Sequence, residues 1–163
     1  MELFNPISDI APYIIERLAN EYEAHYLYAN AANWCDNTGY TLAADFFKKE
    51  AADELVHAGK LQKFLNNWGV FFTIPSVTVE PKFTSLPDII KKGYAIEVEL
   101  YKSYNSDVEQ IEKMDKSTYS LLLEMVNIQY DSVAEYRTLI DKLNLIDDTD
   151  KFQVFMYEKE VFE

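Results

Sequence analysis

Five polar residues lie at positions where a helix would turn them toward its own apolar face. Glu54 and His57 are three residues apart, the spacing at which inward-facing di-iron and di-manganese bundles place a carboxylate and an imidazole on one helix. Glu21, Glu97 and Gln129 each share a helix face with apolar or aromatic residues. Burying several unpaired carboxylates is prohibitive unless protons or cations neutralise them. Because carboxylates with an imidazole suit iron or manganese, the pattern predicts a buried metal site.

Four long helices and one short helix are expected to position these residues. Only four glycines and five prolines interrupt the chain, which suits long helices better than many short strands. Periodicity and helix-ending residues place the helices at residues 9–37, 41–67, 86–114, 118–143 and 149–160, with an extended crossover at 70–86. Asp9 or Ser8 is expected to cap the first helix, and Ser85 the third. The predicted fold class is all-α: one domain over residues 1–163, a four-helix bundle whose two helical pairs are joined by a long crossover.

Composition limits the partners that the chain can have. Its 28 acidic residues exceed its 15 basic ones, giving a formal charge of -13. This charge argues against nucleic acid, and it is compatible with a cationic ligand or with solubility alone. No apolar run approaches the roughly 18 residues that a membrane span needs. A single cysteine, Cys35, and an N-terminus without a basic and apolar leader favour a reducing compartment, so a cytoplasmic location is expected.

Several motifs together resemble those of the non-haem bacterial ferritins, over residues 14–161. The matching segments are Glu21-x6-Tyr28, residues 46–58 (FFKKEAADELVHA), residues 94–97 (YAIE), residues 139–143 (LIDKL) and residues 155–160 (FMYEKE). The first three look like that family's ferroxidase centre, and the last two look like the end of its fourth helix and its short fifth helix. The resemblance implies a ferritin-like four-helix bundle with a short fifth C-terminal helix.

The resemblance also implies how the polar residues bind metal. Glu54 would bridge two iron ions in each subunit, with Glu21 and His57 completing the first. Glu97 would hold the second iron, and Gln129 matches a glutamine that the family carries beside it. The implied activity is that of a ferroxidase, which oxidises Fe(II) with dioxygen or peroxide. The ferric product would be stored as mineral inside a shell of twenty-four identical subunits.

Three further expectations follow from the same resemblance. Tyr28 would hydrogen-bond the bridging carboxylate and could donate an electron. The candidate ligands of an auxiliary third iron site are Glu50, Asp53 and Asp131. Residues 128–133 (IQYDSV) depart from the glutamates that the family usually has there, so this third site is expected to be weak or altered. Position 55 is leucine where bacterioferritins have a haem-ligating methionine, so no haem is expected.

Other polar residues near the predicted site have simpler interpretations. His25, one turn above Glu21, is expected to be a core histidine bonded to a neighbouring side chain rather than a ligand. Tyrosines such as Tyr104 are expected to fill the core and interfaces, because tyrosine combines apolar area with a polar tip. Glu50, one turn below Glu54, either guides iron inward or is an exposed or subunit-facing acid. For the metal-ligand candidates themselves, the alternative is a hydrogen-bonded buried network without metal.

Three other functions are compatible with a carboxylate-rich helical bundle. A di-iron oxidase or peroxidase of the rubrerythrin kind usually has a second Glu-x-x-His and often a Cys-x-x-Cys module, and this sequence has neither. A shell subunit without catalytic activity would not need Glu21, Glu54, His57 and Glu97. A miniature ferritin that shields DNA lacks a counterpart of residues 149–160.

Overall fold

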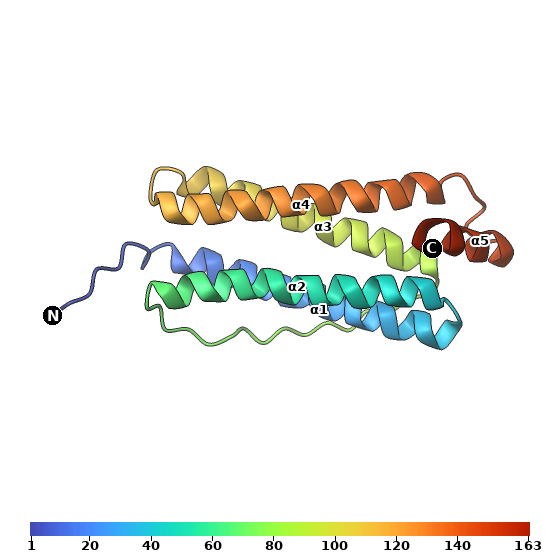
Figure 1. The fold of residues 1–163 in the computed structure, drawn as a ribbon, viewed down its shortest axis with the longest axis horizontal. Helices are drawn as coiled ribbons and strands as arrows, with labels where there is room; N and C mark the ends of the chain where they lie inside the picture. Colours follow the sequence, from blue (N-terminus) through green and yellow to red (C-terminus); the bar gives the residue numbers. More distant parts are fainter.

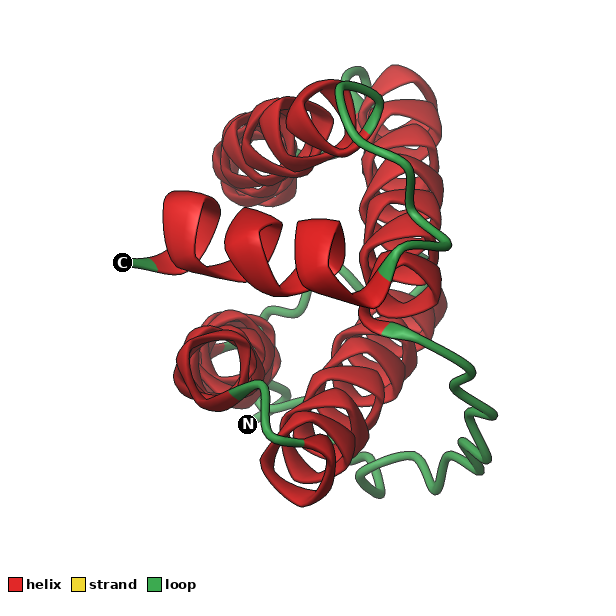
Figure 2. Cartoon of the chain, turned by 90° about the vertical axis from the view of Figure 1, so that its right-hand side faces the viewer, coloured by secondary structure: helices red, strands yellow, loops and turns green.

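The computed structural model describes all 163 residues, and it contains five helices and no strand (Figure 1). The helices are α1 (Ala11–Thr38), α2 (Thr41–Asn67), α3 (Leu86–Ile111), α4 (Lys116–Leu143) and α5 (Lys151–Phe162). Helices α1 and α2 form one antiparallel pair, α3 and α4 form the other, and the crossover between α2 and α3 runs along the outside of the first pair (Figure 1). Helix α5 lies across one end of the bundle (Figure 2). The predicted all-α four-helix bundle with a long crossover and a short fifth helix is confirmed.

Side-chain caps determine where α3 and α4 begin. The hydroxyl of Ser85 accepts a hydrogen bond from the backbone N–H of Asp88 at 3.1 Å, as predicted for the start of α3. The carboxylate of Asp115 accepts one from the N–H of Thr118 at 2.7 Å, so α4 begins at Lys116, two residues before the expected start. Helix α3 ends at Ile111, three residues before the expected end, because residues 112–114 form the turn that leads to this cap.

The start of α1 differs from the prediction. Ile10 precedes the helix, and no side chain caps it, so the expected capping by Asp9 or Ser8 was wrong. The backbone N–H groups of Ile10 and Ala11 instead donate to the carbonyl of Ile7 at 2.9 and 2.8 Å. Ile7 is fully buried, and it anchors a backbone turn that satisfies these groups without a side-chain acceptor.

The interior of the bundle is mostly apolar, but nine polar or charged residues are buried in it: Arg17, Glu21, Glu50, Glu54, Glu97, Asp107, Thr118, Gln129 and Glu158. Buried alanines such as Ala24, Ala51 and Ala58 on α1 and α2 permit the close approach of those two helices. No helix has the combination of length and apolarity that a membrane crossing requires. The bundle therefore surrounds a polar centre with apolar packing.

Candidate metal centre

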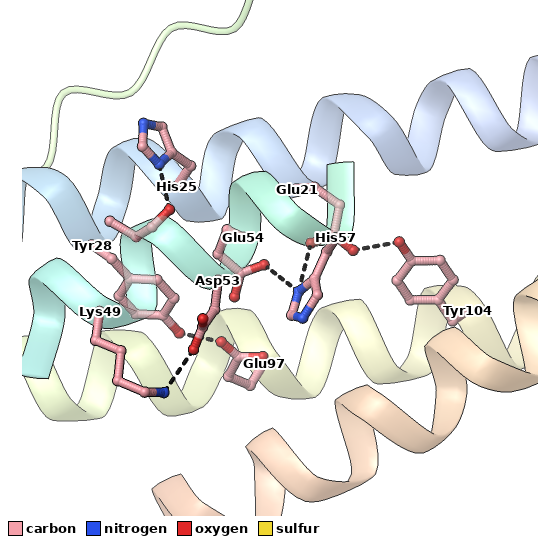
Figure 3. A network of polar contacts seen from close by, with 10 residues as sticks. Glu21, His25, Tyr28, Lys49, Asp53, Glu54, His57, Glu97 and Tyr104 are labelled. Atoms are coloured by element: carbon pink, nitrogen blue, oxygen red, sulfur yellow. Dashed lines mark hydrogen bonds and ion pairs between the residues drawn. The ribbon is translucent and has the colours of Figure 1, made fainter. Parts of the chain in front are cut away.

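Three potential ligands converge between α1 and α2 (Figure 3). Glu21, Glu54 and His57 each offer one ligand atom, and these atoms lie within 4.8 Å of one another. Nδ1 of His57 is 3.1 Å from Oε2 of Glu54 and 3.6 Å from Oε2 of Glu21. Glu54 and His57 face the same way because three residues advance a helix by almost one turn. The group has the size and composition of a site for one divalent cation.

The inward orientation predicted for the carboxylates is confirmed. Glu21 and Glu97 are fully buried and Glu54 is 3% exposed. The His57 side chain is 13% exposed, so it lies at the edge of the buried centre. Glu99, two residues from Glu97 on α3, is 71% exposed and pairs with Lys102 at 3.0 Å. The difference between Glu97 and Glu99 follows from the helical period alone.

Tyr28 contacts a carboxylate other than the expected one. Its hydroxyl donates a hydrogen bond to Oε1 of Glu97, not to Glu54, which was expected as the bridging residue. Tyr28 lies two turns along α1 from Glu21, where that helix faces α3 (Figure 3). Oε2 of Glu54 is already bonded to His57 on its own helix. The predicted partner was therefore wrong, because Tyr28 reaches the carboxylate of α3 instead.

Aromatic packing holds the ring of Tyr28 in place. The ring stacks on Phe47 and on Tyr136, with centroid distances of 6.1 and 5.9 Å. Tyr136 is itself fully buried against Gly93, where an added Cβ would collide with the tyrosine ring. Gly93 thus makes room for this stack, which restricts the positions open to the Tyr28 hydroxyl.

A second tyrosine bonds the carboxylate of α1. The hydroxyl of Tyr104, on α3, donates to Oε1 of Glu21, and both side chains are fully buried. Tyr104 was expected only to fill the core and interfaces. Its spacing is the signal that could have identified this contact, because Glu97 and Tyr104 are separated by the same number of residues as Glu21 and Tyr28.

Several buried polar atoms in the centre have no hydrogen-bond partner. They are Oε2 of Glu21, Oε2 of Glu97, and both the oxygen and the nitrogen of the Gln129 amide. Buried polar atoms are rarely left unsatisfied, and an unpaired carboxylate oxygen is especially costly. Oε2 of Glu21 lies 3.6 Å from Nδ1 of His57, so the centre combines the hard oxygen and imidazole nitrogen donors that iron accepts. The residues present therefore fit iron.

Burial changes the protonation of the centre. It raises the pKa of Glu54 well above the usual range and that of Glu97 to about 8, although the bonds from His57 and Tyr28 oppose these shifts. Burial also lowers the pKa of His57, but the carboxylates of Glu21 and Glu54 outweigh it and raise the value to about 10. Without a cation the centre therefore retains protons near neutral pH, and a divalent cation would replace them.

The remaining predicted ligands lie toward α4. Gln129 is fully buried, but it is not part of the compact group between α1 and α2. A surface cleft of about 210 Å³ is lined by Lys49, Glu50, Asp53, Glu54, His57, Ile128, Asp131, Ser132 and Glu135. All three candidates for the auxiliary site therefore line one cleft, which also reaches Glu54 and His57.

The acids of this cleft differ in their surroundings. Asp131 is exposed, and Asp53 forms an ion pair with Lys49 at 2.7 Å. Glu50 is 8% exposed, so the alternative of an exposed acid was wrong for the single chain. Burial, reinforced by the charge of Glu135, raises the pKa of Glu50 to about 7.

His25 takes no part in the centre. Its Nδ1 lies 2.6 Å from the carbonyl oxygen of Ala51, and the ring points away from Glu21 (Figure 3). The partner is backbone and not the side chain that was predicted, because the small Ala51 leaves the α2 backbone within reach of α1. The expectation that His25 is not a ligand agrees with this orientation.

Known proteins resemble this chain over most of its length. The family model described as a ferritin-like domain matches residues 13–146. A bacterial non-heme ferritin of Staphylococcus saprophyticus is 32% identical over 151 residues, covering 90% of this chain and 88% of the relative. One of Campylobacter jejuni is 31% identical over 140 residues, covering 85% and 84%. The solved open-pore ferritin of Archaeoglobus fulgidus has a TM-score of 0.87 at 24% identity, covers 94% of both chains, and supports the fold alone.

Proposed function

We propose, from the premise that the chain belongs to the ferritin family, that its buried carboxylates and imidazole bind two ferrous ions for oxidation. Membership of this family assigns iron storage and ferroxidase activity to the chain. A rubrerythrin-like oxidase without storage is not favoured, because the curated relatives that match most of the chain are ferritins. What the structure adds is a set of residues that could perform the oxidation.

Each buried residue has a proposed role. Glu54, between Glu21 and the side of α3, bridges the two ions, and His57 with Glu21 completes the first site. Glu97 holds the second ion, and the unpartnered amide of Gln129 lies on the α4 side of the centre. Tyr28 fixes Glu97 through its hydroxyl, and this contact makes it a candidate for donating a further electron.

With dioxygen or hydrogen peroxide as the oxidant, the reaction balances in electrons and protons. Two ferrous ions lose one electron each, and the two electrons with two protons convert dioxygen to hydrogen peroxide or hydrogen peroxide to two molecules of water. Glu54 and Glu97 hold protons in the cation-free centre and release them when iron binds. The ferric product then leaves for storage as mineral.

The observation that carries this proposal is the pair of buried carboxylate oxygens without a partner, on Glu21 and Glu97. Neither oxygen accepts a hydrogen bond within the protein, and a bound cation would satisfy both. The acidic cleft over Glu50, Asp53 and Asp131 supports a path for iron to Glu54, and a weak third iron site at the same place.

The proposed assembly is a shell of twenty-four subunits in the cytoplasm. A closed shell would give a particle of about 460 kDa from chains of 19.0 kDa, which native mass spectrometry can measure. A miniature cage with half as many subunits would have half that mass, so this measurement separates the two kinds of ferritin shell.

The catalytic proposal is tested by adding ferrous iron to the assembled protein without oxygen, then admitting air and following the ferric absorbance. The Glu54→Ala variant should oxidise iron much more slowly than the wild type. Glu99→Ala is the matched control, since it removes an exposed glutamate and should oxidise iron at the wild-type rate. Equal oxidation by the wild type and Glu54→Ala would refute the proposal.

A further inference from the structure

Helices α1 and α3 carry the same pair of residues at the same spacing. Glu21 and Tyr28 are seven residues apart on α1, and Glu97 and Tyr104 are seven residues apart on α3. The two helices run in opposite directions (Figure 1). In this arrangement the tyrosine of each helix lies opposite the glutamate of the other, so the contacts are reciprocal: Tyr28 donates to Glu97 and Tyr104 donates to Glu21.

In both contacts, one carboxylate oxygen of the glutamate remains without a hydrogen bond. Tyr28 bonds Oε1 of Glu97 and Tyr104 bonds Oε1 of Glu21, whereas Oε2 of each glutamate has no partner. The free oxygen of Glu21 is 3.6 Å from Nδ1 of His57 and belongs to the compact ligand group. Tyr104 therefore bonds the oxygen of Glu21 that is not the one beside His57, and Tyr28 leaves Oε2 of Glu97 without a hydrogen bond.

An ion pair one turn away joins α1 and α3 in the same register. Arg17, four residues before Glu21, pairs with Asp107, three residues after Tyr104, with 3.3 Å between Nε and Oδ2. Both side chains are almost fully buried. This pair therefore follows the same antiparallel register of α1 and α3 as the two tyrosine contacts.

We propose that Tyr104 is a positioning residue of the metal centre, which holds Oε1 of Glu21 and directs Oε2 toward the cation bound with Glu54 and His57. A carboxylate fixed at one oxygen loses less freedom when the other binds a cation, and such outer contacts orient ligands and raise their affinity. Tyr28 performs the equivalent task for Glu97 at the second cation. This inference rests on the proposed function, because it requires Glu21 to be a ligand.

The test measures cation binding without oxidation. Cobalt(II) is titrated into the assembled wild-type protein and the Tyr104→Phe variant, and binding is followed by calorimetry and by visible absorbance. Phenylalanine keeps the ring and removes only the hydroxyl. We expect the wild type to bind two cobalt ions per subunit, and Tyr104→Phe to bind one of them about 10- to 100-fold more weakly.

Tyr157→Phe is the matched control. Tyr157 is also buried, and its hydroxyl also donates one hydrogen bond, to the carbonyl of Leu139 at 2.8 Å, but it touches none of the proposed ligands. This variant should bind both cobalt ions as the wild type does. Circular dichroism and size-exclusion chromatography establish that each variant folds and assembles, and equal weakening by both variants would show that Tyr104 acts only through packing.

Combined variants identify which ion Tyr104 affects. With Glu21→Ala the first site is already lost, so adding Tyr104→Phe should weaken cobalt binding no further, whereas with Glu97→Ala the full loss should persist. Wild-type affinity in Tyr104→Phe, or an equal loss in both backgrounds, would overturn the inference and leave the proposed function standing. Failure of the wild type to bind cobalt or ferrous iron at all would overturn both.

Discussion

Two buried ionic clusters lie one helical turn apart on α1, and they are neutralised in different ways. Arg17 and Asp107 form an ion pair inside the chain, with 3.3 Å but no hydrogen bond between Nε and Oδ2, and their side chains are only 7% and 8% exposed. In the other cluster, Oε2 of Glu21 and Oε2 of Glu97 also lack a hydrogen bond, and the side chains that contact Glu21 and Glu97 are tyrosine and histidine rather than Lys or Arg. The first cluster carries its own counter-ion, and the second depends on protons or on an external cation.

This difference separates a structural from a functional use of buried charge. A paired charge in the core is costly to break, because removal of one partner leaves the other buried and uncompensated. A cluster without a permanent counter-ion keeps its carboxylates available, at the cost of holding protons until a cation arrives. Variants of each cluster should therefore change different properties of the protein.

The largest effect on folding is expected from the paired cluster. Arg17→Met leaves Asp107 buried without its cation, so we expect the free energy of unfolding to fall by about 3 to 5 kcal/mol. Denaturant titration measures this change. The double variant Arg17→Met with Asp107→Leu should recover most of the loss, and cobalt binding per folded subunit should remain within about twofold of the wild type. Loss of cobalt binding in the double variant would show that the two clusters are not independent.

The largest effect on chemistry is expected from the unpaired cluster. Glu54→Ala should slow the initial oxidation of ferrous iron by at least about 100-fold, equivalent to about 2.7 kcal/mol of transition-state free energy. The metal-free variant should be at least as stable to heat as the wild type, because burial disfavours the Glu54 carboxylate strongly enough to raise its pKa well above the usual range, despite its bond to His57. Stopped-flow absorbance and calorimetry measure the two quantities. A variant that is less stable but fully active would reverse the assignment of the two clusters.

The pH dependence of stability should show a smaller effect of the cluster that lacks a permanent counter-ion. The folded protein retains the proton of Glu97 up to a pKa of about 8, whereas the unfolded chain loses it near the ordinary value of 4.5. The folded state therefore binds more protons between these values, and the contribution of Glu97 to the stability of the metal-free protein is lost as pH rises toward 8. Thermal unfolding at several pH values should show this decline. Cobalt(II) should oppose it, and Glu97→Gln should make it shallower; a steeper decline in Glu97→Gln would contradict the assignment.

The smallest effect is expected at the α4 edge of the centre. Gln129→Leu replaces a buried amide without partners by an apolar group of similar size. We expect the affinity for the second cobalt ion to fall by about tenfold and that for the first to stay unchanged, since one neutral ligand contributes less than a carboxylate. Calorimetric titration separates the two. A loss of affinity for the first cobalt ion alone would contradict the assignment of Gln129 to the second site.

Most of the fold could be predicted from the sequence. The scarcity of glycine and proline and the long helical periods predicted an all-α bundle, and Ser85 predicted the start of α3. The start of α1 could not be predicted in this way, because a backbone turn anchored by the buried Ile7 replaces the expected side-chain cap. Capping residues are visible in a sequence, whereas backbone acceptors are not.

The candidate centre could be predicted only within each helix. Periodicity correctly predicted that Glu97 points inward and Glu99 outward, because the direction of a side chain within one helix depends on spacing alone. It gave the wrong partner for Tyr28 and none for Tyr104, since contacts between α1 and α3 depend on how the two helices align. The antiparallel alignment of the two Glu-x6-Tyr pairs provides this missing information.

The most direct test of the account is a crystal of the protein soaked in cobalt(II) and examined by anomalous scattering at the cobalt edge. We expect two peaks in the middle of the bundle, one bound by Glu21, Glu54 and His57 and the other by Glu54 and Glu97. The tyrosine hydroxyls should remain on the opposite oxygens of Glu21 and Glu97. A centre without anomalous density, with those free carboxylate oxygens bonded to protein groups instead, would contradict the claim that these buried acids serve an external cation.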